Sequence, residues 1–188
     1  MTTDLKDILS ASYKSQKEAE AMLKPKGYTY DKDLSSITDK VFLDSYGNPL
    51  VLHRGSKRVV DDWLLSNLPL AVGLEKYSPR FQKGKEVVQK VREKYPGTTI
   101  TSASHSLGGS IGERSGADKV ITFNKGAGLG DIGKNIPGSQ TDLRTKYDLP
   151  SLLSTYQTGG KKIELEGSIN PYATHVVSTG LPENTFFV

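Results

Sequence analysis

Residues 100–109 of the chain read Ile-Thr-Ser-Ala-Ser-His-Ser-Leu-Gly-Gly. The β-branched and small residues at the start predict a strand, and a helix is expected to begin near Leu107. Ser106 then lies at the tip of a tight strand-to-helix turn, an arrangement known as a nucleophile elbow. Gly108 would let the helix pack close to the strand, and the helix N-terminus would offer N–H groups to a developing oxyanion. The stretch therefore predicts a nucleophilic serine.

The stretch departs in one place from the general elbow pattern, which is G-x-S-x-G. Ser104 stands where that pattern has its first glycine, and serine is small enough for the position. The alternative interpretation is a turn rich in glycine and serine that only connects a strand to a helix. The strand before Ser106 and the two glycines after Leu107 favour the elbow.

Length, composition and charge limit what the chain can be. Its 188 residues are enough for one domain with a sizeable core, and the absence of cysteine excludes disulfides, thiol catalysis and cysteine-bound metal. The N-terminus has no apolar signal region, and no stretch approaches the roughly 20 apolar residues of a membrane span, so we expect an intracellular protein. The net charge is +4 and the lysines are spread along the chain. We expect no nucleic-acid partner, whereas transient contact with an anionic membrane surface is compatible with this charge.

Upstream of the elbow, the sequence predicts a helical N-terminal cover over residues 1–40. Apolar residues recur at helical spacing, Ser15-Gln16-Lys17-Glu18 has the form of a capping box, and Pro25 with Gly27 would end the second helix. We expect this cover to pack over the main sheet.

Strands and helices alternate through the rest of the chain. Besides the elbow we expect a β-hairpin at residues 41–53 and an amphipathic helix at 79–94. Three further strands are expected at 119–123, 143–147 and 161–165. This alternation predicts an α/β fold with a mostly parallel central sheet flanked by helices. Because there is no internal repeat, linker or low-complexity segment, residues 1–188 are expected to form a single domain.

The most apolar stretch covers residues 63–74 and is broken by a proline and a glycine. Apolar runs are usually core, so core packing is the first interpretation. The alternative is a lid or an acyl pocket, in which Trp63, Leu64 and Leu68 would line the substrate pocket.

Residues 128–135 come close to two phosphate-binding motifs, G-x-G-x-x-G and G-x-x-x-x-G-K. Both motifs need a helix directly after them, because the phosphates lie at its N-terminus. Pro137 and Gly138 follow too soon for such a helix, and Asn135 stands where a P-loop has serine or threonine. We therefore expect a glycine-rich surface loop.

A hydrolytic serine needs a histidine as general base and a carboxylate that orients this histidine. The chain has three histidines, His53, His105 and His175. His105 adjoins the elbow serine, and elbow geometry would point its side chain elsewhere. The α/β-hydrolases carry their triad in the order serine, acid, histidine, and His175 alone satisfies that order. We expect it in a loop near the C-terminus.

The orienting carboxylate must lie between Ser106 and His175. Asp148 is placed best, because it follows the strand predicted at 143–147 and functional groups gather where such strands end. Asp142 precedes that strand and would lie at its far end, while Asp118 and Asp131 are weaker candidates. The alternative for Asp148 is a simple turn residue.

Several pieces of the sequence together resemble the class 3, or fungal-type, lipases of the α/β-hydrolase superfamily. In chain order they are Leu52-His53-Arg54-Gly55-Ser56 with Asp62-Trp63, Ser78-Pro79-Arg80-Phe81 and its helix, His105-Ser106-Leu107-Gly108-Gly109, Phe123-Asn124, Asp148-Leu149-Pro150, and His175. The resemblance covers about residues 40–180. The chain departs from the family in Ser104 for glycine, in Leu149 for the proline after the acid, and in its shortness.

The resemblance implies a compact α/β-hydrolase-like fold and a role for each site residue. Ser106 would be the nucleophile, His175 the base and Asp148 the orienting acid, while the backbone N–H groups of Ser56 and Leu107 would form the oxyanion hole. No metal or cofactor is implied. Small cysteine-free members of this type occur in intracellular settings and in large DNA viruses.

Two functions from different classes follow. The first is a serine esterase or lipase that hydrolyses carboxylic esters of lipids, acylglycerol or phospholipid, or small esters, through an acyl-enzyme. The alternative is a catalytically silent hydrolase fold that binds lipid or serves as an assembly module. The predicted triad and both oxyanion turns favour the enzyme, because a silent module does not need all five residues. The oligomeric state is left open.

Overall fold

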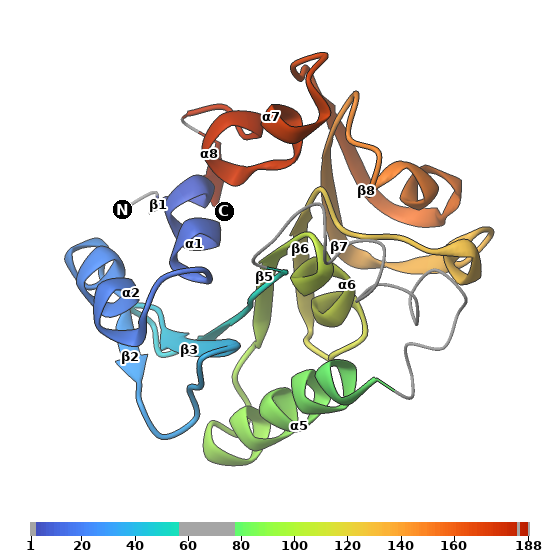
Figure 1. Ribbon diagram of the computed structural model, residues 1–188. Coiled ribbons are helices and arrows are strands. Elements are labelled where there is room, and N and C mark those ends of the chain that lie inside the picture. Colours follow the sequence, from blue (N-terminus) through green and yellow to red (C-terminus); the bar gives the residue numbers. More distant parts are fainter. Residues whose placement is uncertain (1–2, 57–77, 184, 188) are drawn as a thin grey trace.

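The computed structural model describes residues 3–56, 78–183 and 185–187, and its centre is a seven-stranded sheet (Figure 1). The strands lie side by side in the order in which they follow one another along the chain. The first two pairs are antiparallel and every later pair is parallel, which confirms the mostly parallel sheet expected from the sequence. The strands are β2 (Thr29–Asp31), β3 (Asp39–Leu43), β4 (Pro49–His53), β5 (Thr101–His105), β6 (Lys119–Phe123), β7 (Asn135–Thr145) and β8 (Thr158–Leu165).

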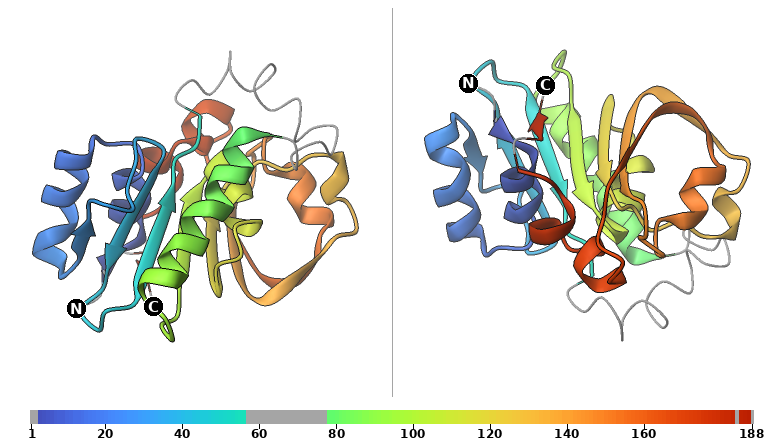
Figure 2. Two further views of the ribbon diagram at one scale, coloured as in Figure 1. Left: turned by 90° about the horizontal axis from the view of Figure 1, so that it is seen from below. Right: turned by 90° about the horizontal axis from the view of Figure 1, so that it is seen from above.

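Helices cover both faces of this sheet (Figure 2). The helices α1, α2 and α8 pack on one face, while α5 packs on the other face together with α6. The α-helices are α1 (Leu5–Ala11), α2 (Gln16–Leu23), α5 (Pro79–Lys94), α6 (Leu107–Glu113), α7 (Pro171–His175) and α8 (Val177–Gly180), and the 3₁₀ helices are η1 (Lys24–Lys26), η3 (Leu129–Asp131) and η4 (Leu152–Tyr156). The molecule is therefore a helix–sheet–helix sandwich.

Alternate residues of the central strands face opposite helical layers. In β4, Leu50 and Leu52 are buried on the side of α1, whereas Val51 between them packs with valines of α5. In β3, Phe42 and Val41 divide in the same way. Because side chains alternate across a strand, this continuous apolar run fits a sheet that is covered on both faces.

The N-terminal segment forms the expected helical cover only in part. Ser15 has both hydrogen bonds of a capping box with Glu18, and Gly27 ends the helical region with a left-handed φ of 88°. Residues 29–31, in contrast, form the edge strand β2 of the main sheet. A separate two-stranded pair joins β1 (Thr3–Asp4) to β9 (Phe186–Phe187), so the two ends of the described chain lie together.

Strand β7 differs from the sequence prediction. We expected a surface loop over residues 128–135 and a strand at 143–147, but β7 already begins at Asn135 and ends at Thr145. Its pairing with β8 shifts register between Ile136 and Thr141, so an irregularity accommodates Pro137 and Gly138. Proline has no N–H for a regular ladder, and a bulge is where a strand tolerates it.

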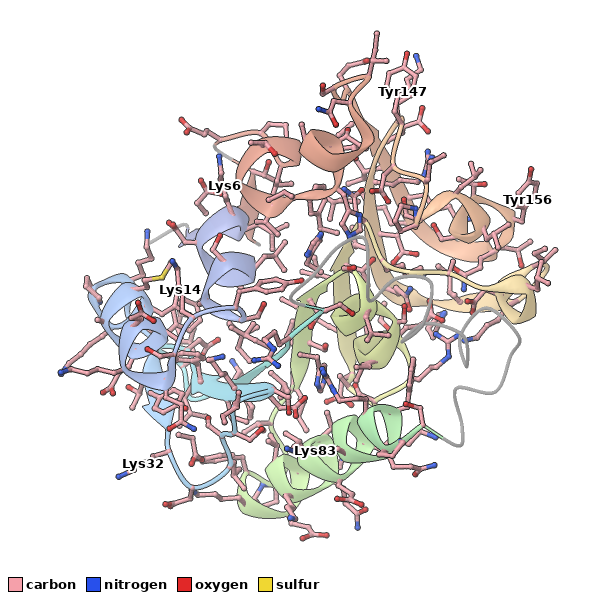
Figure 3. The ribbon with its side chains drawn as sticks, in the orientation of Figure 1. Lys6, Lys14, Lys32, Lys83, Tyr147 and Tyr156 are labelled. Carbon is pink, nitrogen blue, oxygen red and sulfur yellow. The ribbon has the colours of Figure 1, made fainter. Side chains whose placement is uncertain are left out.

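Charged side chains project from several sides of the molecule. Lys6, Lys14, Lys32 and Lys83 extend outward from four different segments (Figure 3). In the part of the chain that the structure describes, every helix is too short or too polar to span a bilayer.

Candidate active site

The elbow predicted from the sequence is present between β5 and α6. Ser106 follows the last residue of β5 and precedes the first residue of α6, with φ of 57° and ψ of −131°. Its backbone N–H donates to the carbonyl oxygen of Phe123 at 3.1 Å, which fixes the turn to β6. A non-glycine residue with positive φ is strained and persists only where its surroundings hold it.

Ser106, His175 and Asp148 form one line of hydrogen bonds. Nε2 of His175 lies 2.9 Å from Oγ of Ser106, and Nδ1 of His175 lies 2.5 Å from Oδ1 of Asp148. All three side chains are buried. His175 ends the short helix α7 rather than lying in a loop as expected, and α7 lies beyond the carboxyl ends of the central strands (Figure 1).

Asp148 lies in the turn after β7, and its neighbours fix its orientation. The N–H of Ser151 donates to Oδ2 of Asp148 at 2.9 Å, so one carboxylate oxygen holds the turn while the other faces His175. A carboxylate in this position makes Nδ1 the protonated nitrogen of the imidazole and leaves Nε2 to accept a proton from the serine.

The other three carboxylates considered from the sequence have different partners. Asp118 pairs with Arg92 near the surface, and Asp131 pairs with Arg114. Asp142 lies within β7, not before the strand as expected. Its Oδ2 is 2.5 Å from the ammonium of Lys125.

His53 and His105 are both buried and both have structural partners. Nδ1 of His53 lies 2.8 Å from Oδ1 of Asp39. Nε2 of His105 lies 2.7 Å from the carbonyl oxygen of His175, and the two imidazole centroids are 4.8 Å apart. Burial above all, and the proximity of the His175 imidazole, lower the pKa of His105 well below its ordinary range, so this ring is neutral. The sequence analysis gave His105 no role, although its position directly before Ser106 was a signal.

The turn Arg54-Gly55-Ser56 leaves β4 beside the elbow. The Arg54 N–H donates to Thr38 at 2.8 Å, and the Arg80 guanidinium donates to the Arg54 carbonyl oxygen at 2.6 Å. A Cβ added to Gly55 would lie 3.2 Å from Cβ of Ser106, so the turn packs directly against the nucleophile candidate. Ser56 follows in the same turn, and Leu107 is the first residue of α6.

The remaining predicted site residues, Trp63, Leu64 and Leu68, lie outside the described residues. Within those residues no group of three or more histidine, aspartate or glutamate side chains is arranged to hold a metal ion. The arrangement around Ser106 brings together a serine hydroxyl, an imidazole, a carboxylate and the first residue of a helix.

No protein-family model matches the sequence, and no curated protein matches it at a significant level. Similar solved structures exist. A mutant of MDLA from Penicillium cyclopium superimposes with a TM-score of 0.51 at 14% identity, over 87% of this chain and 76% of that protein. A crystal structure of a fungal lipase gives a TM-score of 0.50 at 14% identity, over 93% of this chain and 80% of the lipase. The chain therefore has the α/β-hydrolase-like fold of the fungal class 3 lipases.

Proposed function

We propose that the protein is a serine hydrolase that cleaves the carboxylic ester bonds of lipids, acylglycerols or phospholipids, or of small esters. The observation that carries the proposal is the hydrogen-bonded line from Ser106 Oγ through His175 to Asp148, with distances of 2.9 and 2.5 Å. A buried serine with a strained backbone, a histidine and a carboxylate in this order are what nucleophilic ester hydrolysis needs. The lipase-like fold agrees with this chemistry.

In the proposed mechanism, Ser106 attacks the carbonyl carbon of the ester while Nε2 of His175 takes the hydroxyl proton. Asp148 keeps the proton on Nδ1 and stabilises the imidazolium that forms. Collapse of the tetrahedral intermediate transfers the proton from His175 to the leaving alcohol and leaves an acyl group on Ser106. Water, activated by His175, then releases the carboxylic acid and restores the serine.

The oxyanion of the intermediate needs two donors, and we assign them to the backbone N–H groups of Leu107 and Ser56. The first N–H groups of a helix have no partner within the helix, and Leu107 opens α6 directly behind Ser106. The contact between Gly55 and Ser106 supports the second donor, because it brings the turn of Ser56 to the same place.

The substrate side of the proposal rests on the fold and the charge of the chain. A lipid or small ester is the expected partner, with transient contact at a membrane surface, and no nucleic acid. Trp63, Leu64 and Leu68 would line the acyl pocket.

A serine-directed fluorophosphonate probe tests the proposal. We expect the probe to label the wild-type protein and Ser102→Ala, and to leave Ser106→Ala unlabelled. Ser102 is a matched control because it lies four residues away in the chain, is buried, and has a hydroxyl without a hydrogen-bond partner among the described residues. Hydrolysis of p-nitrophenyl esters of increasing chain length, and of phospholipid vesicles, then defines the substrate.

The loss of activity in Ser106→Ala should reach several orders of magnitude in kcat, with an unchanged melting temperature. A folded Ser106→Ala protein with near-normal turnover would contradict the assignment. A wild-type protein that is folded, unlabelled and inactive on every ester would instead support the silent lipid-binding module.

A further inference from the structure

We propose that Tyr13, from the N-terminal cover, is a positioning residue that joins the oxyanion turn to the catalytic histidine through His105. The inference rests on the proposed function, because it concerns the same reaction. It assigns to the N-terminal segment a part in catalysis that sequence analysis had limited to packing.

The middle of the connection is a pair of hydrogen bonds on the two nitrogens of one imidazole. Oη of Tyr13 lies 2.6 Å from Nδ1 of His105, and Nε2 of His105 lies 2.7 Å from the carbonyl oxygen of His175. The His105 ring also stacks on Phe123 with centroids 5.6 Å apart. The ring is thus held on both edges and on one face.

The partners decide where the protons are. A carbonyl oxygen only accepts hydrogen bonds, so Nε2 of His105 must carry the hydrogen. Burial above all, and the proximity of the His175 imidazole, keep the pKa of His105 low, so the ring is neutral and Nδ1 presents a lone pair. Tyr13 therefore donates its hydroxyl hydrogen to His105.

The other end of the connection reaches the turn at Gly55. The Tyr13 hydroxyl packs against Gly55, where an added Cβ would overlap it. Burial raises the pKa of this phenol, so it stays protonated. The phenol thus supports the turn whose next residue, Ser56, carries the N–H proposed for the oxyanion.

Both hydrogen bonds therefore run in one direction, from Tyr13 to His105 and from His105 to the backbone of His175, and the phenol packs against Gly55 at the other end. The two ends of this chain are the turn proposed to hold the oxyanion and the residue proposed to move the proton. Both must act on the same carbonyl group, and neither is adjacent to the other in sequence. A misplacement of about 1 Å at such a group can lower a rate by roughly 10²-fold.

Comparison of Tyr13→Phe with Tyr95→Phe tests the proposal. Tyr95 is the matched control: its hydroxyl donates to Oδ2 of Asp31 at 2.7 Å, where α5 ends and far from the elbow in the fold. We expect Tyr13→Phe to lower kcat for p-nitrophenyl esters by roughly 10- to 100-fold with KM little changed. Tyr95→Phe should retain the wild-type kcat, although its melting temperature should fall by about as much as that of Tyr13→Phe.

Nitrogen-15 NMR of the histidine side chains supplies a readout that does not depend on activity. In Tyr13→Phe the Nδ1 resonance of His105 should move toward that of an unbonded lone pair, while Tyr95→Phe leaves it in place. If Tyr13→Phe does not fold, 3-fluorotyrosine at position 13 provides a stronger donor of nearly the same shape, and both kcat and the Nδ1 resonance should still change.

A Tyr13→Phe protein with wild-type kcat, or an unmoved Nδ1 resonance, overturns the inference. Failure of the proposed function has a different signature, namely a wild-type protein that the fluorophosphonate does not label. The two failures are therefore distinguishable in one set of samples.

Discussion

At the scale of single residues, backbone strain is concentrated at the candidate site. Among the described residues other than glycine, those with positive φ are Ser106 at 57° and Asn124 at 43°. They are neighbours, because the Ser106 N–H donates to the residue just before Asn124. The Asn124 side chain donates to the carbonyl oxygen of Thr174 at 2.9 Å, next to His175. Two unfavourable conformations thus support one another where the nucleophile and base candidates meet.

Asp148→Asn tests the orienting role of the carboxylate. The amide can still accept the N–H of Ser151, so the turn should remain folded. It no longer enforces the protonation of Nδ1 in His175, and we expect kcat to fall by about 10⁴-fold. Steady-state kinetics and a melting curve measure both effects.

Asp118→Asn is the control for this substitution. Asp118 makes a partly exposed ion pair with Arg92 and accepts the N–H of Ile100 at 2.8 Å. The substitution Asp118→Asn should leave kcat unchanged. Equal losses in the two variants would argue that Asp148 acts only as a turn residue.

At the scale of elements, local sequence signals predicted most of the fold. The helix expected at 79–94 is α5 with the same bounds, because its apolar residues repeat at helical spacing and a proline stands at its first position. The strand expected at 119–123 is β6. The N-terminal part of β7 could not be predicted, since Pro137 and Gly138 are turn signals in sequence and only pairing with β8 overrides them.

The candidate site, too, could be predicted from the sequence only in part. Ser106 and Asp148 could be predicted because each follows a predicted strand, and His175 because it alone satisfies the chain order serine, acid, histidine. The Tyr13 contact to His105 spans 92 residues, and no local pattern encodes a contact of that range. Nothing in the sequence near Tyr13 distinguishes it from an ordinary core tyrosine.

Gly108→Ala tests the close approach between α6 and β4. A Cβ at this position would overlap the carbonyl oxygen of His53 and would lie 3.1 Å from the carbonyl carbon of Arg54. The backbone must therefore shift at the start of the proposed oxyanion turn. We expect a loss of about 1–3 kcal/mol in the free energy of unfolding, together with a lower kcat.

Gly138→Ala is the matched control, because a Cβ there meets no atom within 4 Å. Urea unfolding should show a change within about 0.5 kcal/mol for this variant. Should Gly108→Ala be equally well tolerated, the contact between helix and turn would not constrain the site.

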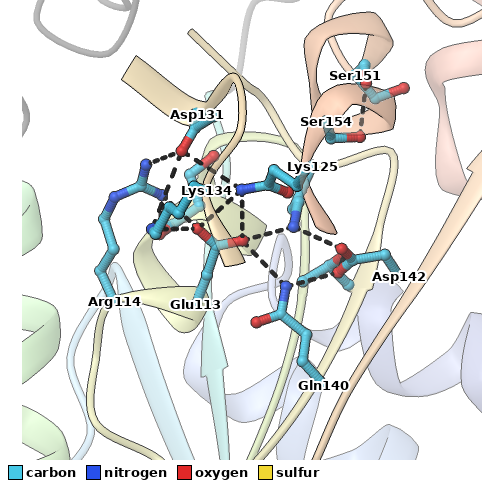
Figure 4. A network of polar contacts seen from close by, with 12 residues as sticks. Glu113, Arg114, Lys125, Asp131, Lys134, Gln140, Asp142, Ser151 and Ser154 are labelled. Atoms are coloured by element: carbon cyan, nitrogen blue, oxygen red, sulfur yellow. Dashed lines mark hydrogen bonds and ion pairs between the residues drawn. The ribbon is translucent and has the colours of Figure 1, made fainter. Parts of the chain in front are cut away.

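At the scale of the whole molecule, a buried ion network ties α6 to the second half of the sheet (Figure 4). Glu113 at the end of α6 lies 2.5 Å from Lys125 and 2.7 Å from Lys134, and Lys125 lies 2.5 Å from Asp142 in β7. Arg114 pairs with Asp131 of η3 in the same cluster. Three carboxylates meet three cations, so the charges balance inside the protein.

Glu113→Gln removes one negative charge from this network and should lower the free energy of unfolding. Burial acts to raise the pKa of Glu113, but Lys125, Arg114 and Lys134 outweigh it and lower that pKa well below the ordinary value of 4.5. Because the pKa of Glu113 is lower in the folded than in the unfolded protein, its charged carboxylate stabilises the folded state at pH values above the ordinary 4.5. This stabilisation is lost as the pH falls below 4.5. We expect Glu113→Gln to cost about 3–5 kcal/mol at neutral pH, because it leaves buried cations with fewer partners.

The difference between wild type and Glu113→Gln should shrink as the pH is lowered from about 5 toward 3, measured by urea unfolding at each pH. Glu86→Gln, on the exposed side of α5, is the control and should follow the wild type throughout. A pH-independent difference would show that Glu113 contributes through packing or hydrogen bonds rather than through its charge.

The large sequence separation between Ser106 and His175 has a consequence for the newly made protein. Ser106 and His175 are 69 residues apart, and a ribosome adds about 5–20 residues per second. Ser106 is therefore synthesised on the order of seconds before His175 exists. During that interval the nascent chain lacks the imidazole to which Ser106 hydrogen-bonds. The hydrogen-bonded line from Ser106 to Asp148 can therefore form only once the last part of the fold has been translated.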